Sequence, residues 1–182
     1  FDIHEMAVLS VHEGIPGHHY QLEKLLNDKT KPDYIKYFGE TSYCEGWALY
    51  TENLYDYNKK ELFHKINYEI LRSLRLIIDT GIHYYGWNYD KSFTFMNKYL
   101  DDKDACRSEI LRYISIPCQA LTYKIGEKTI LHLNKSHSYL FKKSGDSPPI
   151  VKANKVKPFF SLGSFKDKVS FQSIELKHGR IF

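Results

Sequence analysis

The 182 residues are enough for one domain with a sizeable core but short for two, and the 15% aromatic content argues against a disordered chain. The net charge of +4 is unevenly spread: residues 135–182 hold 10 Lys and Arg against 3 Asp and Glu, whereas residues 1–134 hold 16 against 19. We therefore expect a slightly acidic domain over residues 1–134 and a basic, solvated tail over residues 135–182.

The sequence also limits the partners and compartments to be considered. No apolar run approaches the ~20 residues of a membrane span, and no aromatic-basic motif of a nucleic-acid reader accompanies the tail, so neither partner is expected. Cys44, Cys106 and Cys118 lack CxxC spacing and fit free thiols. Because the chain begins at Phe1, we expect a piece of a longer protein and leave its localisation open.

Helical spacing of apolar residues dominates the first 134 positions, and it predicts an all-α fold. The first helical pattern, over residues 3–25, breaks at Pro16-Gly17. A second helix is predicted from residue 34 or 41 to Tyr57, and a third over residues 60–82, ended by Gly81 or Gly86. Further helices are predicted over residues 91–100, 105–114 and 119–133, and a lone strand over 169–174.

The segment His12-Glu13-Gly14-Ile15-Pro16-Gly17-His18-His19 concentrates metal-binding side chains. Zinc hydrolases need imidazole or carboxylate ligands and a carboxylate beside the reacting water. On a regular helix, however, His18 lies about 240° around the axis from His12, and His19 lies about 10 Å along it. A bulge at Pro16-Gly17 would bring the next histidine back toward His12. The spacing leaves two readings open, a metal site and a His-rich surface helix.

The same segment, extended to Tyr20-Gln21, closely resembles the HExxPGHxxQ signature of the bacterial family catalogued as domain of unknown function eight-eight-five. That family is similar to zinc metallopeptidases of the gluzincin type. Further matching blocks follow in the family's order: EGWALYTE at 45–52, RLIIDTGIH at 75–83 with Gly86-Trp87, Arg112-Tyr113 with Pro117, and QALTYKIG at 119–126. The match covers about residues 8–130 and excludes the tail. It implies gluzincin-like catalytic helices, the C-terminal part of a larger domain.

The resemblance implies one zinc ion per chain, with His12, His18 and Glu45 as ligands and His19 as the fallback. It implies Glu13 as the general base. The Gly46 that follows Glu45 predicts a close approach by another chain segment.

Five further residues have candidate roles, each with a structural alternative. Glu52 either orients a ligand histidine or is a surface charge. His83 and Tyr123 are candidates to stabilise an oxyanion, with Asp79 fixing the tautomer of His83 or forming a purely structural pair with it. Arg112 either binds a substrate carboxylate in bidentate fashion or pairs with Glu109 or Asp79.

The leading functional prediction is zinc-dependent hydrolysis of peptides, with a carboxypeptidase or a dipeptidase as the candidate classes. The alternative is a catalytically inactive helical scaffold or binding module derived from such an enzyme. A di-iron bundle is a third possibility, but it requires two Glu-x-x-His pairs, and the sequence offers one candidate, Glu61 with His64.

Overall fold

The computed structural model describes residues 2–144, which form an all-α fold with no strand among them. The prediction of fold class is therefore confirmed. The strand expected over 169–174, like the rest of 145–182, lies outside the described residues. The elements are α1 (Ile3–Glu13), α2 (His18–Asn27), α3 (Asp33–Tyr37), α4 (Thr41–Glu52), α5 (Lys59–His83), α6 (Tyr89–Met96), α7 (Lys103–Ser115), the 3-10 turn η1 (Gln119–Leu121) and α8 (Thr122–Ser144).

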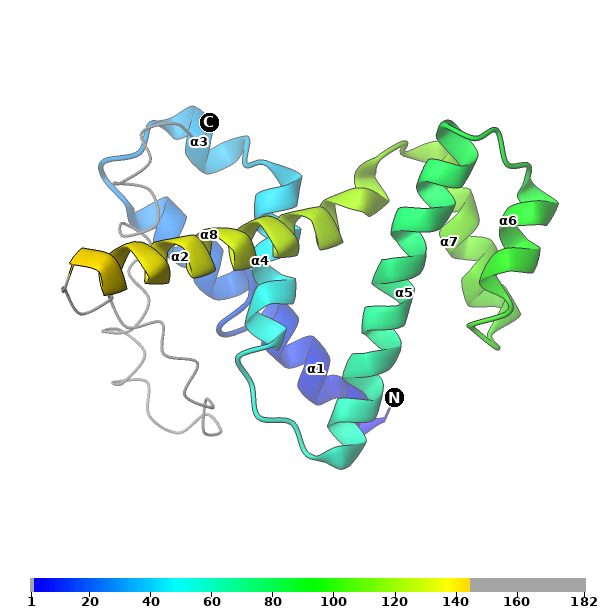
Figure 1. The fold of residues 1–182 in the computed structure, drawn as a ribbon, viewed down its shortest axis with the longest axis horizontal. Coiled ribbons are helices and arrows are strands. Elements are labelled where there is room, and N and C mark those ends of the chain that lie inside the picture. Colours follow the sequence, from blue (N-terminus) through cyan, green and yellow to red (C-terminus); the bar gives the residue numbers. More distant parts are fainter. Residues whose placement is uncertain (1, 145–182) are drawn as a thin grey trace.

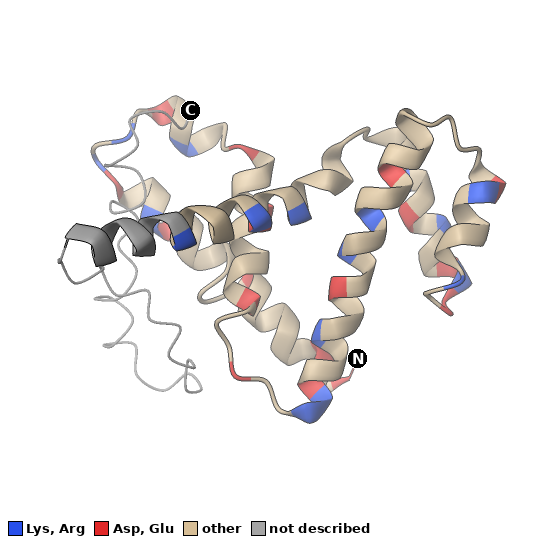
Figure 2. Cartoon of the chain, viewed as in Figure 1, with Lys and Arg blue, Asp and Glu red and all other residues tan. Residues whose placement is uncertain are grey.

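The long helix α5 joins two groups of helices (Figure 1). On one side α1 packs against α4 and α5, while α8 crosses α4 and makes the most extensive helix contact of the described chain. On the other side α6 and α7 pack against the C-terminal half of α5. Acidic and basic residues are scattered over these helices (Figure 2). None of the helices within residues 2–144 has the length and apolar character needed to cross a membrane.

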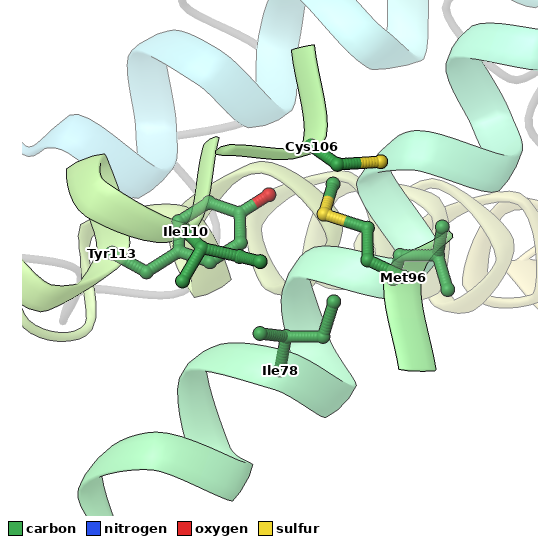
Figure 3. Close-up of a cluster of buried hydrophobic side chains, with 7 residues drawn as sticks. Ile78, Met96, Cys106, Ile110 and Tyr113 are labelled. Carbon is green, nitrogen blue, oxygen red and sulfur yellow. The ribbon is translucent and has the colours of Figure 1, made fainter. Parts of the chain in front are cut away.

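The main apolar core lies between α5, α6, α7 and η1. Ile78, Met96, Cys106, Ile110 and Tyr113 are fully buried there and point toward one another (Figure 3). A second cluster joins α2 and α4 through Tyr20, Trp47 and Tyr50. All three cysteines are free thiols, as predicted.

The crossing of α4 and α8 depends on two glycines. A Cβ built on Gly46 would lie 2.5 Å from the Cα of Gly126, and one built on Gly126 would lie 2.8 Å from the Cα of Gly46. Both distances are below any real carbon–carbon contact, so neither position accepts a side chain without separating the helices. The close approach predicted at Gly46 is confirmed, and α8 is the approaching segment.

Three predicted helix ends were wrong. The second helix ends at Glu52, not Tyr57, because the Asn53 side chain donates to Leu49 O and to Glu127 as the chain turns away. The last helix continues past residue 133 to Ser144, since the sequence has neither Gly nor Pro between Gly126 and Gly145. The helix α6 ends at Met96, not at residue 100. Of the two glycines predicted to end α5, Gly81 lies inside that helix against the Trp87 ring, whereas Gly86, with φ +65°, follows its end as predicted.

The helix α5 begins with a reciprocal cap, and along its length it exposes apolar residues and buries charged ones. The Asn58 side chain accepts from Lys60 N and Glu61 N, and Glu61 accepts from Asn58 N. Several apolar positions of its periodic pattern are exposed (Leu62, Ile66, Ile70 and Ile77). Arg72, Arg75 and Asp79 are buried instead. Buried charged side chains need partners of opposite charge or hydrogen-bond acceptors. The partner of Arg72 is Glu52, which contacts His12 of the candidate site.

Candidate metal centre

The break between α1 and α2 returns His18 to His12. A Cβ on Gly17 would lie 2.5 Å from the carbonyl carbon of His12, so the turn is tight enough to require glycine. The Trp47 indole donates to Pro16 O at 2.9 Å and ties the turn to α4. The rings of His12 and His18 consequently meet edge to face, with centroids 4.9 Å apart. The predicted effect of the Pro16-Gly17 break is confirmed.

Glu45, on the second turn of α4, completes a three-residue group with these histidines. One ligand atom from each residue lies within 4.8 Å of the other two. Glu45 Oε2 is 3.4 Å from His18 Nε2 and 3.9 Å from His12 Nε2. Ligand atoms of a tetrahedral zinc with Zn–N of about 2.0–2.1 Å stand about 3.3 Å apart. The donor set and its spacing therefore fit one zinc ion after small side-chain movements.

The neighbouring His19 and Glu13 are both exposed. His19 does not belong to the three-residue group, so the geometry favours His18 over the fallback ligand. Glu13 lies close enough for its charge to act on His18. The hydrogen bond with Glu45 is the main cause that raises the pKa of His18 above its ordinary value, and the charges of Glu45 and Glu13 add to it.

Glu52 lies behind the group, fully buried. Its Oε1 accepts from His12 Nδ1 at 2.7 Å and from Arg72 Nη2 at 3.0 Å. Two roles were considered for Glu52, a surface charge and a carboxylate that orients a ligand histidine. Its burial and its hydrogen bond with His12 fit the second role. A proton on Nδ1 leaves Nε2 of His12 with a lone pair directed at the group.

Arg72 was not predicted to take part in the site, although the spacing of polar residues on α5 indicates it. Tyr68, Arg72, Arg75 and Asp79 follow one another at spacings of four, three and four residues, so they share one face of α5. A polar face on an otherwise apolar helix indicates buried polar partners. The partners themselves come from α1, α4, α7 and the loop before η1, and no local pattern identifies them.

Tyr123, at the start of α8, lies beside the Glu45 carboxylate. Burial alone would raise the pKa of Glu45, but hydrogen bonds with His18 and Tyr123 and the charge of His18 hold it below its ordinary value. The hydroxyl oxygen of Tyr123 accepts from Arg112 Nη2 at 3.0 Å, and the Arg75 guanidinium lies 4.5 Å from its ring. The structure therefore brings Tyr123 to the group.

Arg112 is largely occupied by protein partners. Its Nη2 donates to Gln119 at 2.7 Å as well as to Tyr123, and its Nη1 lies 3.4 Å from Glu109. With both Nη2 hydrogens used, the bidentate grip on a substrate carboxylate is not open in this structure. The pairing with Glu109, one of the alternatives considered, is present, whereas Asp79 bonds elsewhere.

His83 and Asp79 do not form the expected pair. Both oxygens of the Asp79 carboxylate lie 3.2 Å from Cys118 N, which donates to them, and burial raises the pKa of Asp79. His83 Nε2 donates to Tyr113 O at 2.9 Å, so a backbone carbonyl fixes the tautomer of His83. His83 is exposed, lies about 16 Å along α5 from Arg72, and does not belong to the three-residue group.

The di-iron alternative finds no support among the described residues. Glu61 caps the start of α5, and His64 Nε2 lies 3.2 Å from Asp2. Neither residue belongs to the three-residue group.

Comparison with known proteins now assigns the chain to a family. The sequence profile described as "Bacterial protein of unknown function (DUF885)" matches residues 1–140. The chain belongs to this family. Among curated proteins, none matches.

One solved crystal structure has the same fold over most of this family member. It comes from Colwellia psychrerythraea and is described as a lipoprotein; it shares 29% identity over 78% of this chain with a TM-score of 0.73. This chain covers 25% of that one, so it spans about a quarter of the length of the relative it matches.

Proposed function

We propose that this chain carries the metal site of a zinc-dependent peptidase, with His12, His18 and Glu45 as the ligands of one zinc ion. The observation that carries the proposal is the approach of their three ligand atoms to within 4.8 Å of one another. Glu52 supports it, because a carboxylate on the far nitrogen of a histidine is the usual partner of a zinc ligand.

Zinc held there supplies Lewis acidity, which makes water nucleophilic near neutral pH and polarises a peptide carbonyl. Glu13 is the proposed general base. It follows His12 directly at the end of α1, its side chain is exposed, and its charge acts on His18. A carboxylate in that place accepts the proton of the attacking water and passes it to the departing amine.

Tyr123 is the proposed donor to the oxyanion. The Tyr123 oxygen accepts from Arg112, and its proton is donated to the Glu45 carboxylate, so the same proton would turn to an oxyanion that forms beside Glu45. Arg112 then acts on the substrate through Tyr123. The carboxypeptidase or dipeptidase preference stays a prediction, as does peptide cleavage by the longer protein.

The test combines zinc content with activity in the full 182-residue chain. We expect about one zinc per chain by elemental analysis, lost in His12→Ala and Glu45→Ala. Glu13→Gln should keep the zinc and lose hydrolysis of a peptide library by about 10²-fold or more. His19→Ala, a neighbouring exposed histidine, is the matched control and should keep both.

Two results would contradict the proposal. One is a folded parent chain that binds no zinc when zinc is supplied; the other is a Glu13→Gln variant that hydrolyses peptides normally. Zinc binding without hydrolysis of any peptide would instead favour the inactive binding module.

A further inference from the structure

Three buried polar atoms behind His12 make no hydrogen bond with any of the described residues. They are Glu52 Oε2, Arg72 Nη1 and the hydroxyl of Tyr57. Their side chains belong to one neighbourhood. Arg72 Nη2 donates to the other oxygen of Glu52, and burial raises the pKa of Tyr57, with the charge of Glu52 adding and that of Arg72 opposing.

Buried polar atoms are seldom left without partners, and neighbouring ones are commonly joined by an ordered water. The three atoms are complementary for that purpose. Arg72 Nη1 can only donate, Glu52 Oε2 accepts, and the Tyr57 hydroxyl does either. One water accepting from Arg72 and donating to Glu52, with Tyr57 as its third partner, satisfies all three atoms.

Arg72 is itself held in place. Its guanidinium lies 4.8 Å from the Tyr68 ring, and the Tyr68 hydroxyl donates to Glu5 at 2.7 Å. It also compensates the charge of the fully buried Glu52, since a buried carboxylate is unfavourable without a partner. A chain of contacts thus runs from α1 through α5 to Glu52 and back to His12.

We infer that Arg72 and Tyr57 are positioning residues which, through a shared buried water, fix the Glu52 carboxylate so that His12 donates its Nδ1 proton and presents Nε2 to a metal ion. The metal in this statement rests on the proposed function, whereas the tautomer of His12 does not.

The first measurement is zinc affinity of the full chain, by competition with a chromophoric chelator. Arg72→Met keeps a flexible, unbranched side chain and removes the donors and the charge of Arg72. We expect zinc affinity to fall by about 10–100-fold, the usual effect of losing such a partner. Arg72→Lys should recover part of the loss, and Tyr57→Phe should show a smaller one. Met96→Ala, in the core between α5 and α7, is the control for general destabilisation and should keep the parent affinity.

The second measurement needs no metal. The ¹⁵N shifts of the His12 ring in the metal-free parent should show the Nδ1-protonated tautomer, and Arg72→Met should lose it while circular dichroism stays helical. If Arg72→Met fails to fold, Tyr57→Phe still tests the network through the same two measurements.

The outcomes separate the two proposals. A parent without zinc affinity but with the expected tautomer, lost in Arg72→Met, would contradict the zinc site and support the positioning network. An Nε2-protonated His12 in the metal-free parent would overturn the inference whatever the zinc result. So would an Arg72→Met variant with parent affinity and unchanged His12 shifts.

Discussion

In the proposed zinc site, protons and zinc would compete for His18. The Nε2 of His18 lies 3.4 Å from the Glu45 carboxylate, and that contact raises the pKa of His18. A protonated imidazole cannot bind zinc, so the metal must displace the proton. The contact that assembles the site therefore also sets the pH range in which the site is open to metal.

Zinc affinity should consequently fall as the pH is lowered through the raised pKa of His18, which lies above 6.5. Below that pKa one proton is displaced per zinc, so affinity should drop about tenfold per pH unit. Zinc titrations at several pH values would show it, with His19→Ala as a control that keeps the parent slope. An affinity that does not change between pH 5.5 and 7 would contradict the prediction.

At the scale of single residues, the sequence predicted much of the candidate site. The motif and the resemblance pointed to His12, His18 and Glu45, and the structure brings these three together. The choice between His18 and His19 could not be made from spacing, because it depends on how tightly the chain turns at Gly17. The role predicted for His83 rested on the family resemblance, and in the structure His83 donates to Tyr113 O and does not belong to the three-residue group.

At the scale of elements, the helices were easier to predict than their partners. Periodicity located α5 to within one residue at each end, and Gly86, one of the two glycines predicted to end it, follows its end. Its buried charges were not found, since each pairs with a residue 20 or more positions away. The spacing of these charges along α5 indicates a shared polar face, but no short window of sequence identifies their partners.

One such pair joins α5 to α7 and should make stability depend on pH. Arg75 donates twice to Glu109, at 2.9 and 3.1 Å, and the Tyr113 hydroxyl donates to the same carboxylate. Burial alone would raise the pKa of Glu109, but the Arg75 hydrogen bonds and charge hold it below its ordinary value. The carboxylate therefore stabilises the folded chain while it is ionised.

Glu109→Gln should lower the free energy of unfolding at pH 7 by about 1.5–3 kcal/mol, the range for hydrogen bonds to charged groups. A lowered pKa contributes stability above the unfolded value of about 4.3 and loses it as the pH falls through the folded value. The difference between parent and variant should thus shrink below about pH 4.3, as urea unfolding at pH 7 and pH 3 would measure. A difference that is the same at both pH values would refute the ionic origin.

At the scale of the whole molecule, some apolar side chains form a packed core and others form an exposed stripe on α5. The stripe consists of Leu62, Ile66, Ile70 and Ile77. Ile78 is fully buried between α5, α6 and α7, whereas Ile66, on the N-terminal half of the same helix, is 49% exposed. Apolar character alone therefore did not identify the core. The relative from Colwellia psychrerythraea, about four times as long as the matched part, shows that this fold also occurs inside a much larger chain.

Two substitutions on α5 should separate these surfaces. Ile78→Ala should lower the free energy of unfolding by about 2–5 kcal/mol, because it leaves a cavity in the core. Ile66→Gln should change it by less than about 0.5 kcal/mol, as for an ordinary surface position. Urea unfolding of both variants measures the contrast, and equal losses would mean that the stripe is packed in the 182-residue chain.

The glycine contact between α4 and α8 has a consequence for how the family can change over evolution. Gly46 follows the candidate ligand Glu45, and Gly126 lies one turn after Tyr123, so any side chain at either glycine moves both groups apart. Once one substitution has separated the helices, a second at the facing position meets space already made, and the two effects should not add. Because of this epistasis, restoring one glycine alone would not bring the helices back together, so selection would not favour that single step. Homologues that keep the site are thus expected to keep both glycines, and those that lose one are free to lose the other.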